Sequence, residues 1–195
     1  MSNIINTVVS STWPMIIVSA VIISTLRITY LIKNNRHFTF YKELFYLVTI
    51  IYVLALFQIV TREDVVSWST NNFIPFREIF RYKLGSRLFV KNVIGNIILF
   101  VPFGFFASFY LENKKPKLTI FMSIVASLTI EFVQMSIGRV FDVDDIILNT
   151  LGGIIGFYLY YYLVDISKKL PKIFTSEVVL NIISIILLLG LLTLV

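Results

Sequence analysis

Five charged side chains in this sequence stand inside or next to strongly apolar segments. Glu131 lies within one such segment, and Arg139, Asp142, Asp144 and Asp145 follow it in the stretch GRVFDVDDIILNTLGG. A charged group held away from water is costly unless it is paired or used, so such residues mark candidate functional sites. We therefore expect these five residues to share one polar site that binds a charged ligand or transfers protons.

Glu131 is the strongest candidate for chemistry in this group. Side chains three apart on a helix lie on one face, so Glu131 and Gln134 should point the same way. Without a partner, Glu131 is a candidate catalytic acid or base. With Arg77 or Arg139 as a partner, it is a structural ion pair.

The three aspartates allow two interpretations. Asp142 or Asp144 is well placed to cap the helix that follows, because carboxylates accept hydrogen bonds from the free N–H groups of a helix start. Capping explains one or two of the three. Alternatively, Asp142, Asp144 and Asp145 are candidate ligands of a hard divalent cation such as Mg²⁺ or Ca²⁺. The spacing alone does not decide, so the cofactor stays unknown, with a divalent cation as the candidate.

Three asparagines lie in the neighbouring apolar segments. Asn92 and Asn96 are four apart, and Asn149 follows Asp145 by four, so each pair should share a helix face. Asparagines between membrane helices commonly form hydrogen bonds worth about 1 kcal/mol. They are therefore either packing devices or part of the same polar site. The glycines that follow Asn149 predict close helix packing: Gly152, Gly153 and Gly156.

The elements that must position these residues are membrane-spanning helices. Of the 195 residues, 57% are hydrophobic and 14% are charged, whereas soluble domains average about 25% charged. A helix needs about 20 mostly apolar residues to cross a bilayer, and we predict an all-α polytopic bundle of about six spans: 13–32, 44–60, 92–111, 118–137, 146–164 and 178–195. The chain contains no cysteine, which excludes disulfides and thiolate chemistry, and its basic residues fall in loops, so no nucleic-acid partner is expected.

Counting Lys and Arg gives an orientation for these spans. Ten of the 17 fall on one side of the predicted topology and seven on the other, which favours both termini outside. The loop before residue 92 and the loop between residues 137 and 146 are separated by two crossings, so they lie on the same face. The polar residues should therefore meet there, at one end of the bundle.

Four motifs in this order resemble the VanZ-like family of bacterial membrane proteins: NFIPF at 72–76, NVIGNIILFVPFGF at 92–105, IEFVQ at 130–134 and GRVFDVDDIILNTLGGIIGF at 138–157. The resemblance implies a protein of the cell envelope, with some members lowering susceptibility to teicoplanin. It divides the chain into two N-terminal helices with an interfacial loop at 1–71, a VanZ-like core at 72–164 and a C-terminal helix at 165–195. It implies no catalytic mechanism.

Two functions remain open from the sequence. The first is binding of a lipid-linked cell-wall precursor or a lipoglycopeptide in a polar pocket at the outer face of the bacterial cytoplasmic membrane. Its candidate binding residues are the polar set described above: Arg77, Asn92, Asn96, Glu131, Gln134, Arg139, Asp142, Asp144, Asp145 and Asn149. The second is an enzyme acting on a polyprenyl or phospholipid substrate, with Glu131 as acid or base and Mg²⁺ on the aspartates. Membrane lipids are expected partners in both.

Overall fold

The computed structural model describes residues 2–61, 71–112 and 114–192. All the secondary-structure elements assigned within these residues are helices. Two compact units divide the chain. We call Val60–Asp165 the core unit, and Met1–Ile59 with Ile166–Val195 the peripheral unit. The predicted core at 72–164 lies inside the core unit, and residues 62–70 and 193–195 of the predicted segments lie outside the described residues.

Among the residues that the structure describes, five helices are long and apolar enough to cross a membrane: Trp13–Lys33, Phe40–Val60, Arg87–Leu111, Lys117–Ser136 and Val143–Lys169. A shorter apolar helix, Glu177–Gly190, occupies the position of the sixth predicted span. The chain is therefore an all-α, polytopic membrane-helix protein, as its composition and apolar runs predict.

The peripheral unit contains α1 (Ser2–Lys33), α2 (Phe40–Val60, apart from its last residue) and α8 (Glu177–Leu192). Arg27 of α1 donates to both carboxylate oxygens of Glu43 in α2, at 2.8 and 3.1 Å. The backbone N–H of Tyr41, one of the free donors at the start of α2, donates to Asn181 Oδ1 of α8 at 3.0 Å. Polar contacts at helix ends thus tie the three helices together.

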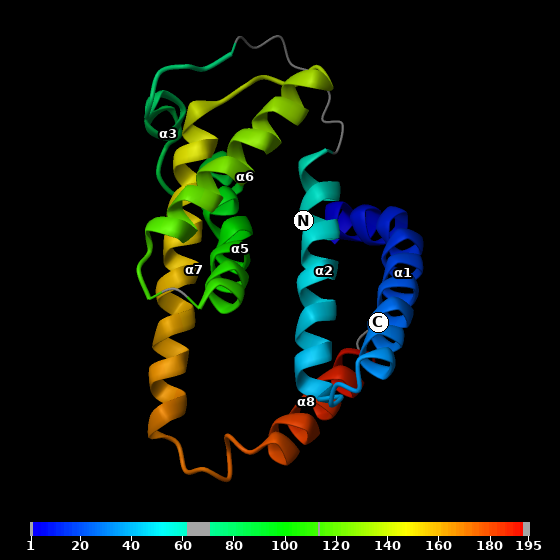
Figure 1. Ribbon diagram of the computed structural model, residues 1–195. Coiled ribbons are helices and arrows are strands. Elements are labelled where there is room, and N and C mark those ends of the chain that lie inside the picture. The colour runs from blue at the N-terminus through cyan, green and yellow to red at the C-terminus, as the bar shows by residue number, and fades with distance from the viewer. Residues whose placement is uncertain (1, 62–70, 113, 193–195) are drawn as a thin grey trace. The chain divides into compact units, whose positions relative to one another are not determined.

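The core unit is built on three helices that lie side by side, α5 (Gly95–Leu111), α6 (Lys117–Ser136) and α7 (Val143–Lys169) (Figure 1). In the described residues 71–94, two short helices precede them, α3 (Arg77–Arg81) and α4 (Arg87–Phe89), and a π-helical turn, η1 (Val90–Ile94), joins α4 to α5. The third predicted span therefore begins five residues earlier than residue 92, at Arg87.

Glycines bring the helices of the core unit into close contact. A Cβ added to Gly104 of α5 would overlap the backbone carbonyl of Gly153 in α7. One added to Gly152 or Gly156 would overlap a carbonyl oxygen of α5, and one on Gly153 would overlap the Ser123 hydroxyl of α6. The predicted packing role of the α7 glycines is confirmed, because only a residue without a Cβ permits this approach.

Candidate functional site

Asp144 holds the loop before α5 against the start of α7. Its side chain is 1% exposed. Oδ2 accepts the N–H groups of Glu78 at 2.7 Å and Ile79 at 3.1 Å, and Oδ1 accepts the N–H of Phe76. The carboxylate thus caps the N-terminus of α3 from a distant part of the chain, which brings α3 beside the start of α7 (Figure 1). Asp144 was a candidate cap for its own helix, and the structure gives that role to Asp142.

Asp142 connects the same loop to α7. Its Oδ1 accepts the N–H of Asp144 at 2.9 Å, which caps α7, and the side-chain amide of Asn72 at 2.8 Å. Asn72 also forms an isolated parallel β-bridge with Asp142. Burial raises the pKa of Asp142 above the ordinary carboxyl range, against the opposing effect of these two hydrogen bonds. Asp142 is therefore a half-buried structural carboxyl at the N-terminal end of α7.

Glu131 lies directly beneath this junction. Its side chain is 1% exposed, and Oε2 accepts the backbone N–H of Asp142 at 2.8 Å. The second oxygen, Oε1, is buried and has no hydrogen-bond partner. Buried polar atoms are nearly always partnered, so Glu131 stays a candidate for ligand binding or proton transfer.

Two further polar pairs join the core helices. The amide of Asn96 in α5 donates to Asp145 Oδ1 in α7. The amide of Asn149, one turn further along α7, donates to Ser127 Oγ in α6 at 2.8 Å. Asp145 and Asn149 do share a face, and each is used to connect α7 to a different neighbour.

Gln134 and Arg139 meet at the last carbonyl of α2. Gln134 Nε2 donates to Val60 O at 3.2 Å, and Arg139 Nη1 donates to the same oxygen at 2.9 Å. The last carbonyls of a helix lack hydrogen-bond donors within the helix. Gln134 and Arg139 supply the donors for this one. Within the described part of the chain neither Arg139 nor Arg77 forms an ion pair with Glu131, so the alternative of a structural ion pair is not realised.

Two candidates, Arg77 and Asn92, lie outside the set of hydrogen bonds that joins Asn72, Glu131, Asp142 and Asp144. Arg77 is exposed on α3. Asn92 lies in the π-helical turn, and its side chain acts on the Tyr82 hydroxyl. Burial raises the pKa of Tyr82 above its ordinary value, with Asn92 opposing the shift. Asn92 and Asn96 therefore serve different partners, although their spacing predicted a common one.

The sequence comparison decides the family. The family model described as VanZ/LLP1 matches residues 40–165, which is most of the chain. This chain belongs to the VanZ/LLP1 family. The resemblance read from its four motifs is thereby confirmed.

A curated relative gives a narrower match. Protein VanZ from Enterococcus faecium is 38% identical over 74 residues, which are 36% of this chain and 44% of that protein. The chain thus matches less than half of the length of this curated relative. No solved structure matches the chain.

Within this VanZ/LLP1 chain, the aspartates are not arranged as a metal centre. Among the residues that the structure describes, no group of three Asp, Glu or His side chains is placed to hold a metal ion. The oxygens of Asp142 and Asp144 instead accept hydrogen bonds from amides, and Asp145 accepts from Asn96. Each of the three candidate cation ligands therefore joins two chain segments through its own hydrogen bonds.

Two parts of the site escaped the sequence analysis. Asn72 belongs to a family motif but was not among the candidates, because its bridge to Asp142 depends on the folded loop. Ser127 belongs to a row of buried polar residues on α6, with Thr119, Ser123 and Glu131, each at most 2% exposed. Their regular spacing of four was a readable signal, since residues four apart form one stripe along a helix.

Proposed function

We propose that this protein acts in the bacterial cytoplasmic membrane, with both termini outside, where it binds an amphipathic cell-envelope ligand and lowers susceptibility to teicoplanin-type antibiotics. The ligand is a lipid-linked cell-wall precursor or the lipoglycopeptide itself. Membership of the VanZ/LLP1 family supports the role in the envelope. The binding site is assigned to the end of the core unit where the predicted polar residues gather.

The surface of the segment from α3 to α4 carries this proposal. Phe80 and Leu84 are 82% and 81% exposed, and Leu88 is also exposed. Arg77 and Arg87 are exposed among them, and neither forms an ion pair within the described residues. Arginine binds phosphates and carboxylates through paired hydrogen bonds, while exposed apolar side chains suit an acyl or prenyl chain.

Asp142 and Asp144 hold the backbone that carries this surface. Asp144 fixes the start of α3, and Asp142 fixes the preceding loop through Asn72. A ligand therefore meets arginines whose backbone is already ordered, which lowers the entropy lost on binding. Glu131 Oε1, a buried acceptor without a hydrogen-bond partner, would accept a ligand amine or hydroxyl.

The test is teicoplanin susceptibility in a sensitive bacterial host that expresses the protein. We expect wild-type protein to raise the inhibitory concentration, and the Arg77→Gln/Arg87→Gln double variant to remove that protection at equal membrane abundance. The Lys114→Gln/Lys117→Gln variant removes the same charge from exposed lysines after α5 and should keep protection. Protection that survives in the arginine variant, or is absent in the wild type, contradicts the proposal.

A second experiment separates the two ligands. It compares teicoplanin with a second drug, a glycopeptide that has no acyl chain. Protection against both drugs indicates precursor binding, whereas protection against teicoplanin alone indicates that the acylated drug is bound.

An enzyme acting on a polyprenyl or phospholipid substrate is the alternative, and the free Oε1 of Glu131 is the observation that favours it. The test is turnover of a labelled lipid precursor by the purified protein. Glu131→Gln keeps an oxygen for the Asp142 N–H, so this variant should still fold. Loss of turnover in Glu131→Gln would support catalysis over binding. Turnover that also stops on addition of a chelator would point to Mg²⁺ supplied together with the substrate.

A further inference from the structure

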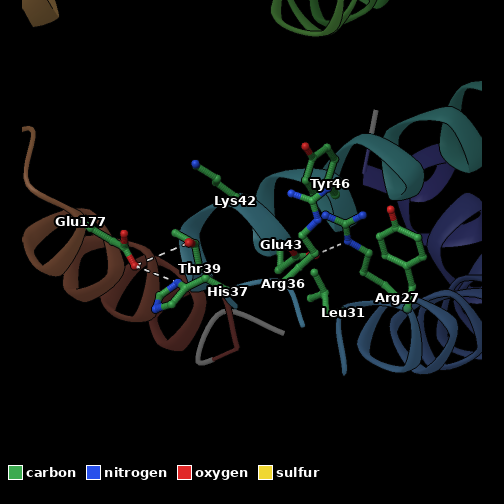
Figure 2. A pocket seen from close by; sticks show the side chains of 10 residues that line it. Arg27, Leu31, Arg36, His37, Thr39, Lys42, Glu43, Tyr46 and Glu177 are labelled. Atoms are coloured by element: carbon green, nitrogen blue, oxygen red, sulfur yellow. Dashed lines mark hydrogen bonds and ion pairs between the residues drawn. The ribbon is translucent and has the colours of Figure 1, made fainter. Parts of the chain in front are cut away.

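A charged hollow lies in the peripheral unit, and none of the residues that line it is assigned to the proposed function. It has a volume of about 540 Å³ and is formed by the ends of α1, the start of α2 and Glu177 of α8 (Figure 2). Arg27, Arg36, His37 and Lys42 line it, together with the carboxylates of Glu43 and Glu177.

Most of the negative charge in this hollow is already used. Both oxygens of Glu43 accept from Arg27, whose guanidinium also lies 4.9 Å from the centre of the Tyr46 ring. Glu177 Oε1 accepts from the Thr39 hydroxyl at 3.5 Å and lies 3.8 Å from His37 Nδ1 (Figure 2). The Arg27–Glu43 pair is therefore a neutral, positioned wall of the hollow.

Two cations remain without an acidic partner. Arg36 and Lys42 are exposed, and within the described residues neither forms an ion pair. Lys42 Nζ lies 5.8 Å from the centre of the adjacent Tyr41 ring. Counting Arg27, Arg36 and Lys42 against Glu43 and Glu177, the hollow carries one excess positive charge before His37 is protonated.

We propose that this hollow binds the phosphate of an anionic lipid head group. The hollow opens where α1 ends and α2 begins, which is the depth at which head groups meet membrane helices. Ile28, Ile32 and Phe38 are exposed beside it and offer an apolar surface to the acyl chains. Arg36 and Lys42 contact the phosphate, and the Arg27–Glu43 pair joins the α1 and α2 walls of the hollow.

The test is native mass spectrometry of the full-length protein in detergent, titrated with phosphatidylglycerol or with phosphatidylcholine. We expect wild-type protein to bind phosphatidylglycerol more tightly, because choline neutralises its own phosphate. Each basic residue near an anionic lipid contributes about fivefold in affinity, so Arg36→Gln/Lys42→Gln should bind about thirtyfold more weakly. The charge-conserving variant Arg36→Lys/Lys42→Arg should keep most of the affinity, which shows that charge and not folding is measured.

The matched control is again Lys114→Gln/Lys117→Gln, which should bind phosphatidylglycerol as the wild type does. Equal binding of the two lipids by the wild type overturns the proposal, as does an equal loss in the control and in the Arg36→Gln/Lys42→Gln variant. Inorganic phosphate is the third arm. If it displaces phosphatidylglycerol at equal concentration, the hollow recognises a free anion and the assignment to a lipid is wrong.

Discussion

Asp144 offers the sharpest test of how the candidate site is held together. One buried carboxylate accepts three backbone N–H groups, from Phe76, Glu78 and Ile79. In Asp144→Asn, one oxygen becomes an NH₂ group, which donates where the loop needs an acceptor. At least one of the three N–H groups then loses its partner.

The cost follows from these contacts. A buried N–H left unsatisfied costs about 1–3 kcal/mol, and the loss of charge from the remaining hydrogen bonds adds about 1 kcal/mol. The free energy of opening the loop should therefore fall by about 2–4 kcal/mol, since water can reach the N–H groups once α3 lifts from α7. That change corresponds to an opening equilibrium roughly 30-fold to 700-fold larger.

Hydrogen–deuterium exchange followed by mass spectrometry measures this equilibrium segment by segment. Exchange should accelerate in peptides that contain residues 76–79, while peptides from α6 keep the wild-type rate. Glu112→Gln removes an exposed carboxylate elsewhere in the core unit and serves as the control. Wild-type exchange at 76–79 in Asp144→Asn would refute the assignment of Asp144 as the cap of α3.

Two further predictions concern packing and pH. Gly104→Ala should lower the thermal unfolding midpoint, because overpacking at a helix contact typically costs about 1–3 kcal/mol. The control is Gly190→Ala, where an added Cβ meets nothing within 4 Å and the midpoint should not fall. Equal midpoints in both variants would contradict the close α5–α7 contact. Burial raises the pKa of Asp142, so the native state holds this proton more tightly than the unfolded chain does, and the stability that Asp142 contributes should fall as pH rises from about 4 through the raised pKa. Asp142→Asn should lack this part of the pH dependence of the unfolding midpoint, and an identical dependence in both proteins would show that burial of Asp142 is not its source.

The sequence predicted the spans, the glycine contacts and the family because each depends on a local pattern. Apolar length identifies a membrane helix, and small residues at short spacing identify a close contact. It also led us to expect that the polar residues meet at one end of the bundle, and Glu131, Asp142 and Asn72 do meet there. The number of crossings between two loops was sufficient for that inference.

Individual partners could not be predicted in the same way. Asp144 accepts from a loop more than 60 residues earlier in the chain, and no local pattern specifies which N–H groups that loop presents. The π-helical turn at Val90–Ile94 changes the register between Asn92 and Asn96, so the spacing of four no longer gives one face. Arg36 and Lys42 looked like ordinary loop charges because their hollow requires α8 as its third wall.

The choice of donors in the core unit has a consequence for what its surface can bind. Asp142 and Asp144 are satisfied by amide N–H groups, which carry no net charge. Had Asp144 been paired with Arg77, the loop would be held equally well, but the guanidinium would be neutralised and buried with it. Because backbone amides do the holding, Arg77 stays exposed with its full charge above an ordered backbone. A carboxylate that fixes a loop without consuming a cation is the arrangement expected where the cation is needed for a ligand, since both fixed geometry and free charge increase affinity for an anion.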